Sequence, residues 1–301
     1  MKLFYTYDFV KGEMQLKIGN WRNADVTRLA EQVREKKLAE RKGTLYLQDL
    51  GYYKQNTFEE IDKSGNYFIS KVKYGVIFYD LLGNRIDLKK ILSTERQNVD
   101  IKIMIGDRVW RLIGQRAPEQ AIQERVKKAK RSHRENTLSD EYRQFLNYTL
   151  YITNLPEEYN FEGVFTLYRI RWQIELIFKV WKSVLKLHKI HSAKKSRVLC
   201  EVQGKLIMAT ILAMLYHSLN LSSPEYHSYH KIVQFGKSLA YKWALALSSG
   251  YEAHKRFLAY LLKQLARLCK KNKQKTKPRI EDRLIILTAP PSFHLEVLKV
   301  A

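Results

Sequence analysis

Four side chains between positions 168 and 182 have types and spacing that suit contacts with a charged polymer: Tyr168, Arg171, Glu175 and Lys182. On a helix with 100° per residue they fall within a sector of ~60°. The opposite side of this helix is apolar, which predicts that it faces a core. One carboxylate then stands in a row of cations with an aromatic ring at its head, and such cations suit phosphates.

The cationic side continues beyond these four residues, and it also has a simpler interpretation. Lys179, Lys186 and Lys189 extend it. The apolar side comprises Ile170, Ile174, Ile177, Val180, Trp181 and Val184. An ordinary amphipathic helix with a solvated basic face would show the same pattern, with Glu175 as the i,i+4 partner of Lys179. The helix pattern alone leaves both interpretations open.

The composition favours a folded protein with a polyanionic partner. The chain has 301 residues, and its 45% hydrophobic and 12% aromatic content excludes a disordered chain. Its 54 Lys and Arg residues against 30 Asp and Glu residues give a net charge of +24. Nucleic acid commonly neutralises such an excess, although a solubility device would leave the same charge. The charge predicts nucleic-acid binding without saying what is done to the nucleic acid.

Cysteine usage and hydropathy exclude two further classes. Cys200 and Cys269 are the only cysteines, so the chain is neither a disulfide scaffold nor a cysteine-rich zinc protein. A reducing, cytosolic setting fits this usage. The most apolar stretch, 206–216, has about half the length of a membrane span and predicts a core helix. The first residues lack the apolar run of a signal peptide, so no membrane partner is expected.

The elements that must position these residues are both strands and helices. Strands are expected at 3–8, 14–18, 44–48, within 65–116, and at 149–153 and 284–288. Helices are expected at 26–40, 57–63, 118–135, 161–190, 197–220, 229–248 and 252–271. The first two strands should form a hairpin that turns at Gly12. The strand at 44–48 should end at Asp49, and Asn56 or Thr57 should cap the helix that follows.

The motif Tyr-x2-Arg-x3-Glu-x6-Lys resembles the signature of a large group of bacterial insertion-sequence transposases, the DDE type with the YREK motif. Tyr168, Arg171, Glu175 and Lys182 match all four positions at the right spacing. Four fixed residues across so short a stretch seldom coincide by chance. The motif is therefore a specific signal for this family.

Two further segments resemble the same family. Its second Asp follows a strand in an Asp-x-Gly-Tyr/Phe context, and residues 49–52 read Asp-Leu-Gly-Tyr. Residues 2–12, with Lys2-Leu3, Asp8 and Gly12, are similar to the strand–turn element between the family's first and second Asp. The resemblance covers roughly residues 1–220.

The resemblance implies an α/β fold with a ribonuclease-H-like mixed sheet. A β-rich insertion would interrupt this sheet, and C-terminal helices would follow it. The expected parts are the beginning of the catalytic core at 1–63, the insertion with a basic helix at 64–154, the rest of the core with the YREK helix at 155–220, and a helical C-terminal region at 221–301.

The resemblance also implies a site. It assigns catalysis and metal binding to Asp49 and Glu175, because two-metal phosphoryl transfer uses Mg²⁺ or Mn²⁺, which prefer carboxylate oxygens. The residues expected to contact DNA are Tyr168, Arg171, Lys179, Lys182, Lys186 and Lys189. The implied partner is double-stranded DNA, as transposon ends and as target, and a homodimer in the DNA complex is allowed. The resemblance also implies that the protein is bacterial, cytoplasmic and associated with the nucleoid.

The sequence departs from the family at its start. The first catalytic Asp belongs to a strand ahead of the Lys2-Leu3 element, where this chain has Met1. That Asp, its central strand and any DNA-binding region before it are therefore expected to be missing. Asp8 matches the later strand–turn element better than it matches the missing first Asp. If the chain alone cleaved DNA, Asp8 or Asp25 would become the next candidate for that Asp. We expect the neighbouring strands to have an exposed edge, and the chain alone to be a poor nuclease.

Three functions compete for this sequence. The first is an insertion-sequence transposase that cuts and joins DNA, in a truncated form. The second is a non-catalytic basic DNA-binding protein derived from a transposase, and the third is an RNA-binding or ribosome-associated protein. Trp110 could stack on an unpaired base in the first case, or pack in the core in any of them.

Overall fold

The structure is a computed structural model with two compact units, which are described separately. The first unit comprises Met1–Thr6, Leu16–Arg171 and Arg283–Val300, and the second comprises Tyr7–Gln15, Trp172–Asp282 and Ala301. The structure describes residues 2–8, 14–19, 42–92, 97–132, 138–191, 194–222, 226–272 and 294–300, the first two ranges and the last by backbone only. The predicted turn at Gly12, the helix at 26–40 and the strand at 284–288 lie outside these residues.

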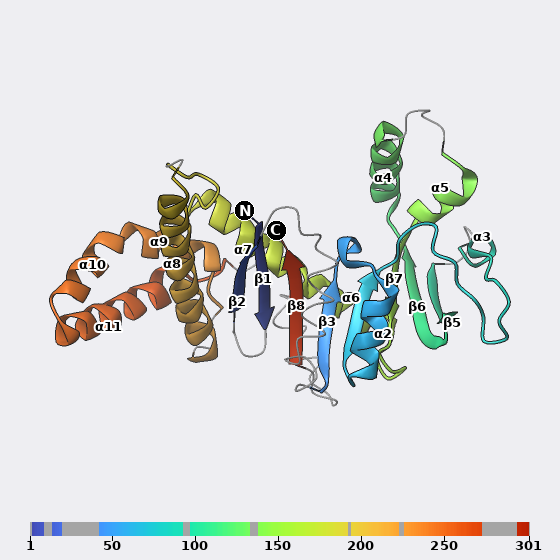
Figure 1. The fold of residues 1–301 in the computed structure, drawn as a ribbon, viewed down its shortest axis with the longest axis horizontal. Coiled ribbons are helices and arrows are strands. Elements are labelled where there is room, and N and C mark those ends of the chain that lie inside the picture. Colours follow the sequence, from blue (N-terminus) through green and yellow to red (C-terminus); the bar gives the residue numbers. More distant parts are fainter. Residues whose placement is uncertain are drawn as a thin grey trace. The chain divides into compact units, whose positions relative to one another are not determined.

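The first unit is built on a mixed sheet (Figure 1). Its strands are β1 (Lys2–Asp8), β2 (Met14–Gly19), β3 (Thr44–Gln48), β4 (Tyr67–Lys71), β5 (Asn98–Ile105), β6 (Arg108–Arg116), β7 (Tyr148–Thr153) and β8 (His294–Val300). They lie in the order β2-β1-β8-β3-β4-β7-β6-β5. β3 pairs in parallel with β4 and β8, whereas the β4–β7, β7–β6 and β6–β5 pairs are antiparallel. The mixed α/β sheet predicted from the sequence is confirmed.

β3 is an interior strand of this sheet. All five of its residues are buried, as is typical of a strand between two parallel neighbours. On one side it pairs with β8, which places Thr44 opposite His294 and Leu47 opposite Val297. The expectation of an exposed edge beside an absent central strand is therefore wrong for β3. A strand from the far end of the chain satisfies its backbone groups.

Helices accompany the sheet of the first unit. They are α2 (Gln55–Lys63), α3 (Leu88–Ile91), α4 (Glu119–Ser132), α5 (Asp140–Leu146) and α6 (Phe161–Ile170), with a 3-10 turn, η1, at Leu50–Tyr52. Phe58 of α2 stacks on Phe68 of β4, with ring centroids 4.7 Å apart. Trp110 of β6 meets the Phe68 ring edge-on at 5.1 Å and is only 2% exposed. The interpretation of Trp110 as a core residue is confirmed, and its burial excludes stacking on a base.

Two local predictions for the first unit are wrong. The alternating pattern of residues 66–80 predicted strand throughout, but β4 ends at Lys71; Gly75 and Gly83 beyond it turn the chain with positive φ values of 85° and 82°. α2 begins at Gln55, with Lys54 as its N-cap and no side-chain cap. Neither Asn56 nor Thr57 caps α2. Thr57 is instead buried under the helix.

Apart from the ends of β1 and β2, the described part of the second unit is mainly helical. Its helices are α7 (Trp172–Ser183), α8 (Lys195–Ser222), α9 (Tyr229–Ser238), α10 (Ala240–Ser248) and α11 (Tyr251–Leu268). The helix predicted at 229–248 is in fact α9 and α10, which meet at Leu239. Gly250, with φ 96°, makes the turn from α10 into α11 at little steric cost.

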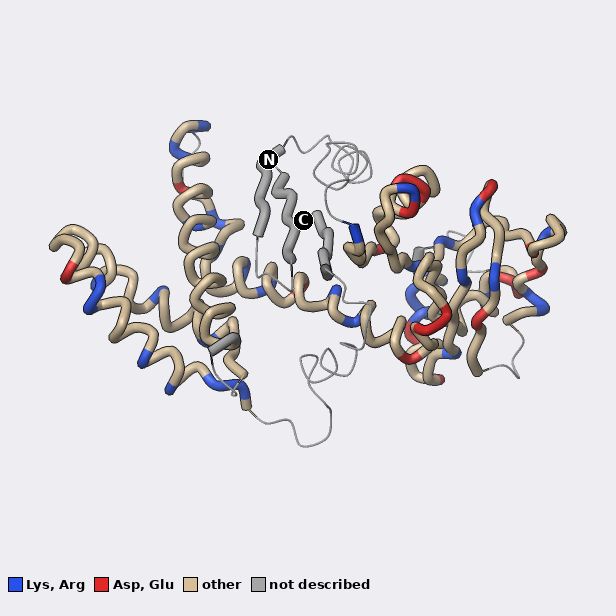
Figure 2. The backbone as a smooth tube through the Cα atoms, turned by 90° about the horizontal axis from the view of Figure 1, so that it is seen from below, with Lys and Arg blue, Asp and Glu red and all other residues tan. Residues whose placement is uncertain are grey.

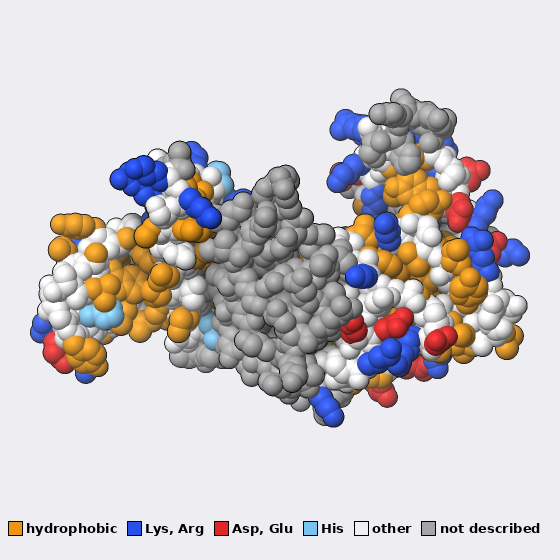
Figure 3. All heavy atoms as spheres, in the orientation of Figure 1, with side chains coloured by type: hydrophobic (Ala, Val, Ile, Leu, Met, Phe, Trp, Pro, Cys, Tyr) orange, Lys and Arg blue, Asp and Glu red, His pale blue; other side chains and the backbone are white. Residues whose placement is uncertain are grey.

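α8 is apolar on more than one side. It buries Val202, Leu206 and Leu212, as a core helix should, but Ile207 and Met214 are 60% and 62% exposed. By length and composition alone, residues Lys195–Asn220 could cross a membrane: an 18-residue stretch within them has a mean hydropathy of 1.7 and is 28% buried. Figure 3 shows hydrophobic side chains gathered over the helices of this unit. The core-helix prediction is met on one side of α8 only.

Candidate active site

Asp49 lies at the carboxyl end of β3, where the sequence predicted it. Asp49 follows the last residue of this interior strand, and η1 begins immediately after Asp49. Its Oδ1 atom accepts a 2.8 Å hydrogen bond from the Leu50 backbone N–H, so the carboxylate also caps this turn. The side chain is 33% exposed. One oxygen of Asp49 is thus used locally, and the carboxylate remains partly open to solvent.

Arg171 contacts the second oxygen of this carboxylate. Its Nη1 atom lies 3.5 Å from Asp49 Oδ2, and its side chain is only 7% exposed. The guanidinium also lies over the Tyr168 ring, 5.5 Å from the centroid. Arg171 therefore forms an ion pair with Asp49, a contact that the helix pattern did not predict. The buried cation neutralises the carboxylate at the end of the strand.

Tyr168 fixes the same strand end by a hydrogen bond to the backbone. Its hydroxyl donates to the carbonyl oxygen of Gln48, at 3.0 Å, one residue before Asp49. Burial raises the pKa of Tyr168 well above its ordinary value, so the hydroxyl keeps its proton and can donate. The Tyr151 ring packs against it with centroids 4.3 Å apart. Two residues of the YREK motif thus hold the residues on either side of the Gln48–Asp49 peptide bond.

The prediction that Tyr168 and Arg171 share a solvent-facing sector is wrong. The expected single helix is interrupted at Arg171, whose N–H donates to the Tyr168 carbonyl three residues earlier. α6 is buried on most of its sides, so the side chains of Tyr168 and of Arg171 at its C-terminal end are also buried, with exposures of 4% and 6%. The helical periodicity of the sequence could not predict this burial, because it does not show which other elements pack against the polar side of a helix.

α7 carries Glu175 and the first of the lysines. Glu175 lies in the first turn of α7 and is half-buried. The predicted apolar side is confirmed at Ile174, Val180 and Trp181, which are buried. The exposed lysines are Lys179, Lys182, Lys186 and Lys189. Lys and Arg residues, blue in Figure 2, recur along the helices of the second unit.

The four lysines Lys179, Lys182, Lys186 and Lys189, here called the lysine stripe, do not lie on a single helix. Lys179 and Lys182 belong to α7, but Lys186 and Lys189 lie beyond its end at Ser183. Asp49 belongs to the first unit and Glu175 to the second. Their meeting at one site therefore stays a prediction.

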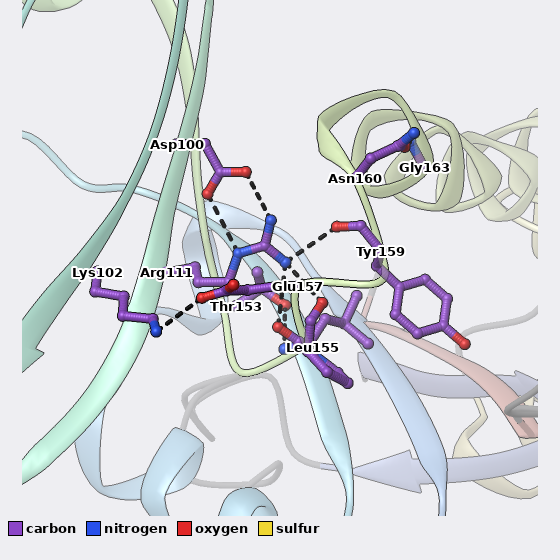
Figure 4. Close-up of polar contacts among 10 residues, drawn as sticks. Asp100, Lys102, Arg111, Thr153, Leu155, Glu157, Tyr159, Asn160 and Gly163 are labelled. Carbon is purple, nitrogen blue, oxygen red and sulfur yellow. Dashed lines mark hydrogen bonds and ion pairs between the residues drawn. The ribbon is translucent and has the colours of Figure 1, made fainter.

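A buried arginine that sequence reasoning missed supports the start of α6 (Figure 4). Nε and Nη2 of Arg111 donate to the two oxygens of Asp100, at 3.2 and 2.6 Å. Nη1 donates to the carbonyl oxygens of Leu155, Pro156 and Tyr159, at 3.3, 2.8 and 3.0 Å. One guanidinium thus ties the β5–β6 hairpin to the loop between β7 and α6.

This loop leads directly into the helix that carries Tyr168 and Arg171. Asn160 ends the loop and caps α6, its Oδ1 accepting from the Gly163 N–H at 2.9 Å. Lys102 and Glu157 make a further ion pair across the same loop, at 2.8 Å. The available sequence signal was the opposite charge of Asp100 and Arg111 on facing strands of a hairpin.

The donor set suits a hard divalent ion. Carboxylate oxygens such as those of Asp49 are ligands that Mg²⁺ and Mn²⁺ prefer. Among the residues that the structure describes, no group of three His, Cys, Asp or Glu side chains is close enough to hold a metal ion. Asp49 is the carboxylate that the first unit supplies.

An Asp that follows a buried interior strand and a Tyr-x2-Arg-x3-Glu-x6-Lys motif are the two features in which this chain resembles the DDE class of transposases. Residues 7–211 match the family described as the transposase DDE domain. This match covers more than half of the chain. The chain belongs to this family.

Curated relatives are transposases of bacterial insertion sequences. That of IS231E from Bacillus thuringiensis subsp. finitimus is 32% identical over 192 residues, 56% of this chain and 40% of the relative. That of IS231C from B. thuringiensis subsp. berliner is 30% identical over 268 residues, 78% of this chain and 55% of the relative. That of IS1151 from Clostridium perfringens is 33% identical over 192 residues, 54% and 40% respectively. The chain spans about half the length of the curated relatives it matches.

Proposed function

We propose that this chain forms the catalytic core of an insertion-sequence transposase, which cuts and joins double-stranded DNA by phosphoryl transfer. The observation that supports this most directly is the contact of Asp49 with Arg171, since it joins the two separate sequence motifs at one strand end. Bacterial relatives favour a place at the nucleoid. A pair of Mg²⁺ or Mn²⁺ ions would activate the attacking oxygen and stabilise the leaving oxygen.

The residues of the chain have distinct parts in this proposal. Asp49 and Glu175 supply carboxylate oxygens to the ions. Arg171 balances the charge of Asp49 while the ions are absent, and is in reach of a phosphate once they are bound. Lys179, Lys182, Lys186 and Lys189 attract the DNA backbone. Tyr168 holds the strand end in place, which matters because small misplacements are costly in phosphoryl transfer.

The sheet supports a ribonuclease-H-like core in this proposal. β3 has parallel neighbours on both sides and ends in the candidate ligand, as the family's second Asp requires. Residues 64–154 would then be the insertion, whose strands β5 and β6 extend the same sheet through β7. Residues 1–63 and 155–220 would form the core, and 221–301 the helical C-terminal region.

A second function, a basic DNA-binding protein without catalysis, is favoured by the net charge of +24 alone. The two functions differ in their response to metal. Both predict that affinity for a mixed-sequence duplex falls steeply with salt. The transposase also predicts that Mn²⁺ tightens binding, since ions held by Asp49 and Glu175 would contact a phosphate. The non-catalytic protein predicts no such effect.

The experiment measures duplex affinity as a function of salt, with and without Mn²⁺, for the parent chain and for Asp49→Asn and Glu175→Gln. We expect Mn²⁺ to tighten binding by the parent and by neither variant. Lys182→Ala should weaken binding without unfolding, because Lys182 is exposed. Affinity that ignores salt would contradict DNA backbone binding, and an equal Mn²⁺ effect in all chains would contradict the assigned carboxylates.

A further inference from the structure

The segment that follows α7 is held in an unusual conformation. Lys186 has φ 52°, the one positive value among described residues other than glycine. A long side chain in the left-handed region costs free energy and persists only where surrounding contacts determine it. The Lys189 N–H donates to the Lys186 carbonyl at 2.9 Å, which closes the turn. This turn separates two exposed lysines, Lys186 and Lys189, from the axis of α7.

Two other lysines bind the carbonyl groups of this segment. Lys205 of α8 donates from Nζ to the carbonyls of Lys186 and Lys189, at 3.2 and 2.7 Å. Lys237 of α9 donates from Nζ to the Val184 carbonyl at 2.9 Å. Cations at the carbonyl groups past a helix end stabilise that end. With the carbonyl oxygens bound to α8 and α9, the side chains of Lys186 and Lys189 remain directed to solvent.

Glu201 of α8 completes the anchor. Its Oε1 atom accepts from Lys205 Nζ at 2.7 Å and lies 3.0 Å from His191 Nδ1. Its Oε2 atom accepts from the His191 backbone N–H at 3.1 Å. These contacts, that from Lys205 foremost, lower the pKa of Glu201 to about 2, so the carboxylate is ionised at neutral pH. Glu201 thus holds both Lys205 and the far end of the segment.

We propose that Glu201 and Lys205 are positioning residues for DNA binding: they fold the segment 184–191 so that Lys186 and Lys189 contact adjacent DNA phosphates. This inference rests on the proposed function and adds residues that lie outside the YREK motif. A carboxylate beside a lysine stripe weakens its attraction for phosphates. The anchoring contacts explain why it is nonetheless there.

The change in net charge and the loss of the proposed positioning role predict opposite effects of Glu201→Gln on DNA affinity. The variant keeps the shape of the side chain and raises the net charge by one, so charge alone predicts tighter DNA binding. Positioning predicts weaker binding, by about threefold to tenfold, the range for loss of one charge-assisted hydrogen bond. Glu252→Gln is the matched control, because Glu252 is exposed in the first turn of α11 and the charge change is the same. The control should bind equally or more tightly.

A second comparison separates positioning from general loss of structure. Lys205→Met and Glu201→Gln are each combined with Lys186→Gln and Lys189→Gln, and affinity for a mixed-sequence duplex is measured as a function of salt. If the anchor acts through these two lysines, neither change weakens binding further once they are gone. Tighter binding by Glu201→Gln, or a full additional loss in the combined variants, would overturn the proposal.

Amide hydrogen exchange without DNA tests the anchor independently of the proposed function. The backbone N–H groups of Lys189 and His191 should exchange slowly in the parent and faster in Lys205→Met, while those in the middle of α8 stay unchanged. Unchanged exchange at both would show that Lys205 does not hold the segment. A parent chain that fails to bind DNA would refute the proposed function and the DNA contacts, whereas the exchange result would still decide whether the segment is anchored.

Discussion

The guanidinium of Arg171 lies 3.5 Å from the carboxylate of Asp49, although 122 positions of sequence separate the two residues. Arg171 is almost fully buried, and Asp49 is one-third exposed. The pair brings the end of β3 and the first half of the YREK motif, Tyr168 and Arg171, together in the first unit. Because the cation is the buried partner, loss of the carboxylate should cost more than a surface ion pair would.

Asp49→Asn should lower the free energy of unfolding by about 1–2 kcal/mol, after allowance for the partial exposure of Asp49. Asparagine still accepts the Leu50 N–H bond, so the cap is kept and only the charge is lost. Urea unfolding measures the change. The control is Asp87→Asn, at a capping residue whose Oδ1 accepts from the Lys89 N–H. Equal effects at both positions would mean that the Arg171 contact contributes nothing.

Tyr168→Phe should lower the free energy of unfolding by about 1 kcal/mol, because the buried Gln48 carbonyl loses its hydroxyl donor. The ring and its packing remain. Tyr151→Phe, in the neighbouring ring, is the control, since its hydroxyl makes no hydrogen bond with the described residues. Should the two variants unfold at the same urea concentration, the hydrogen bond to Gln48 would have no measurable value.

Arg111→Lys should be costly although the charge is kept. Lysine cannot bind both oxygens of Asp100 and also reach the three loop carbonyls, so we expect a loss of about 2–3 kcal/mol. Arg108→Lys is the matched change, because Arg108 makes a longer, more exposed pair with Asp62, at 3.5 Å. That control should lose less than about 1 kcal/mol. A small effect of Arg111→Lys would show that the loop before α6 needs no such anchor.

The carboxylate of Glu201 gives a pH dependence with a definite sign. Its pKa is lowered from an ordinary 4.5 to about 2 in the folded chain, so its stabilising contribution is present above about pH 4.5. That contribution is lost as the pH falls from there through about 2. The difference in unfolding midpoint between the parent and Glu201→Gln should therefore be constant near neutrality and shrink below about pH 4.5. A difference that grows in acid would contradict the lowered pKa.

The sequence predicted those parts of the fold that local patterns determine. The short apolar segment 44–48 indicated a strand that ends before Asp49. The apolar positions Ile174, Val180 and Trp181 indicated the buried side of α7. The burial of Tyr168 and Arg171 could not be predicted, because it depends on which elements surround α6. The same holds for β8, whose pairing with β3 joins distant parts of the chain.

The sequence named candidate site residues, but it did not predict the contacts that the structure shows for them. The motif matches named Asp49 and Arg171, yet spacing on a helix suggested solvent and DNA for an arginine that is buried against Asp49. Arg111 and Lys205 bind backbone carbonyl groups of distant segments. No sequence pattern predicts such contacts, because every residue has a backbone carbonyl group and any of them could be the acceptor.

The most direct test of the central claim asks whether Asp49 and Glu175 hold the same metal site. Fe²⁺ can replace Mg²⁺ at carboxylate sites, and with ascorbate and peroxide it cleaves the polypeptide next to where it is bound. In the presence of duplex DNA, we predict cuts both near Asp49 and near Glu175, suppressed by excess Mg²⁺ and absent from Asp49→Asn and from Glu175→Gln. Cuts near only one of the two residues, or cuts that persist in either variant, would contradict a shared site.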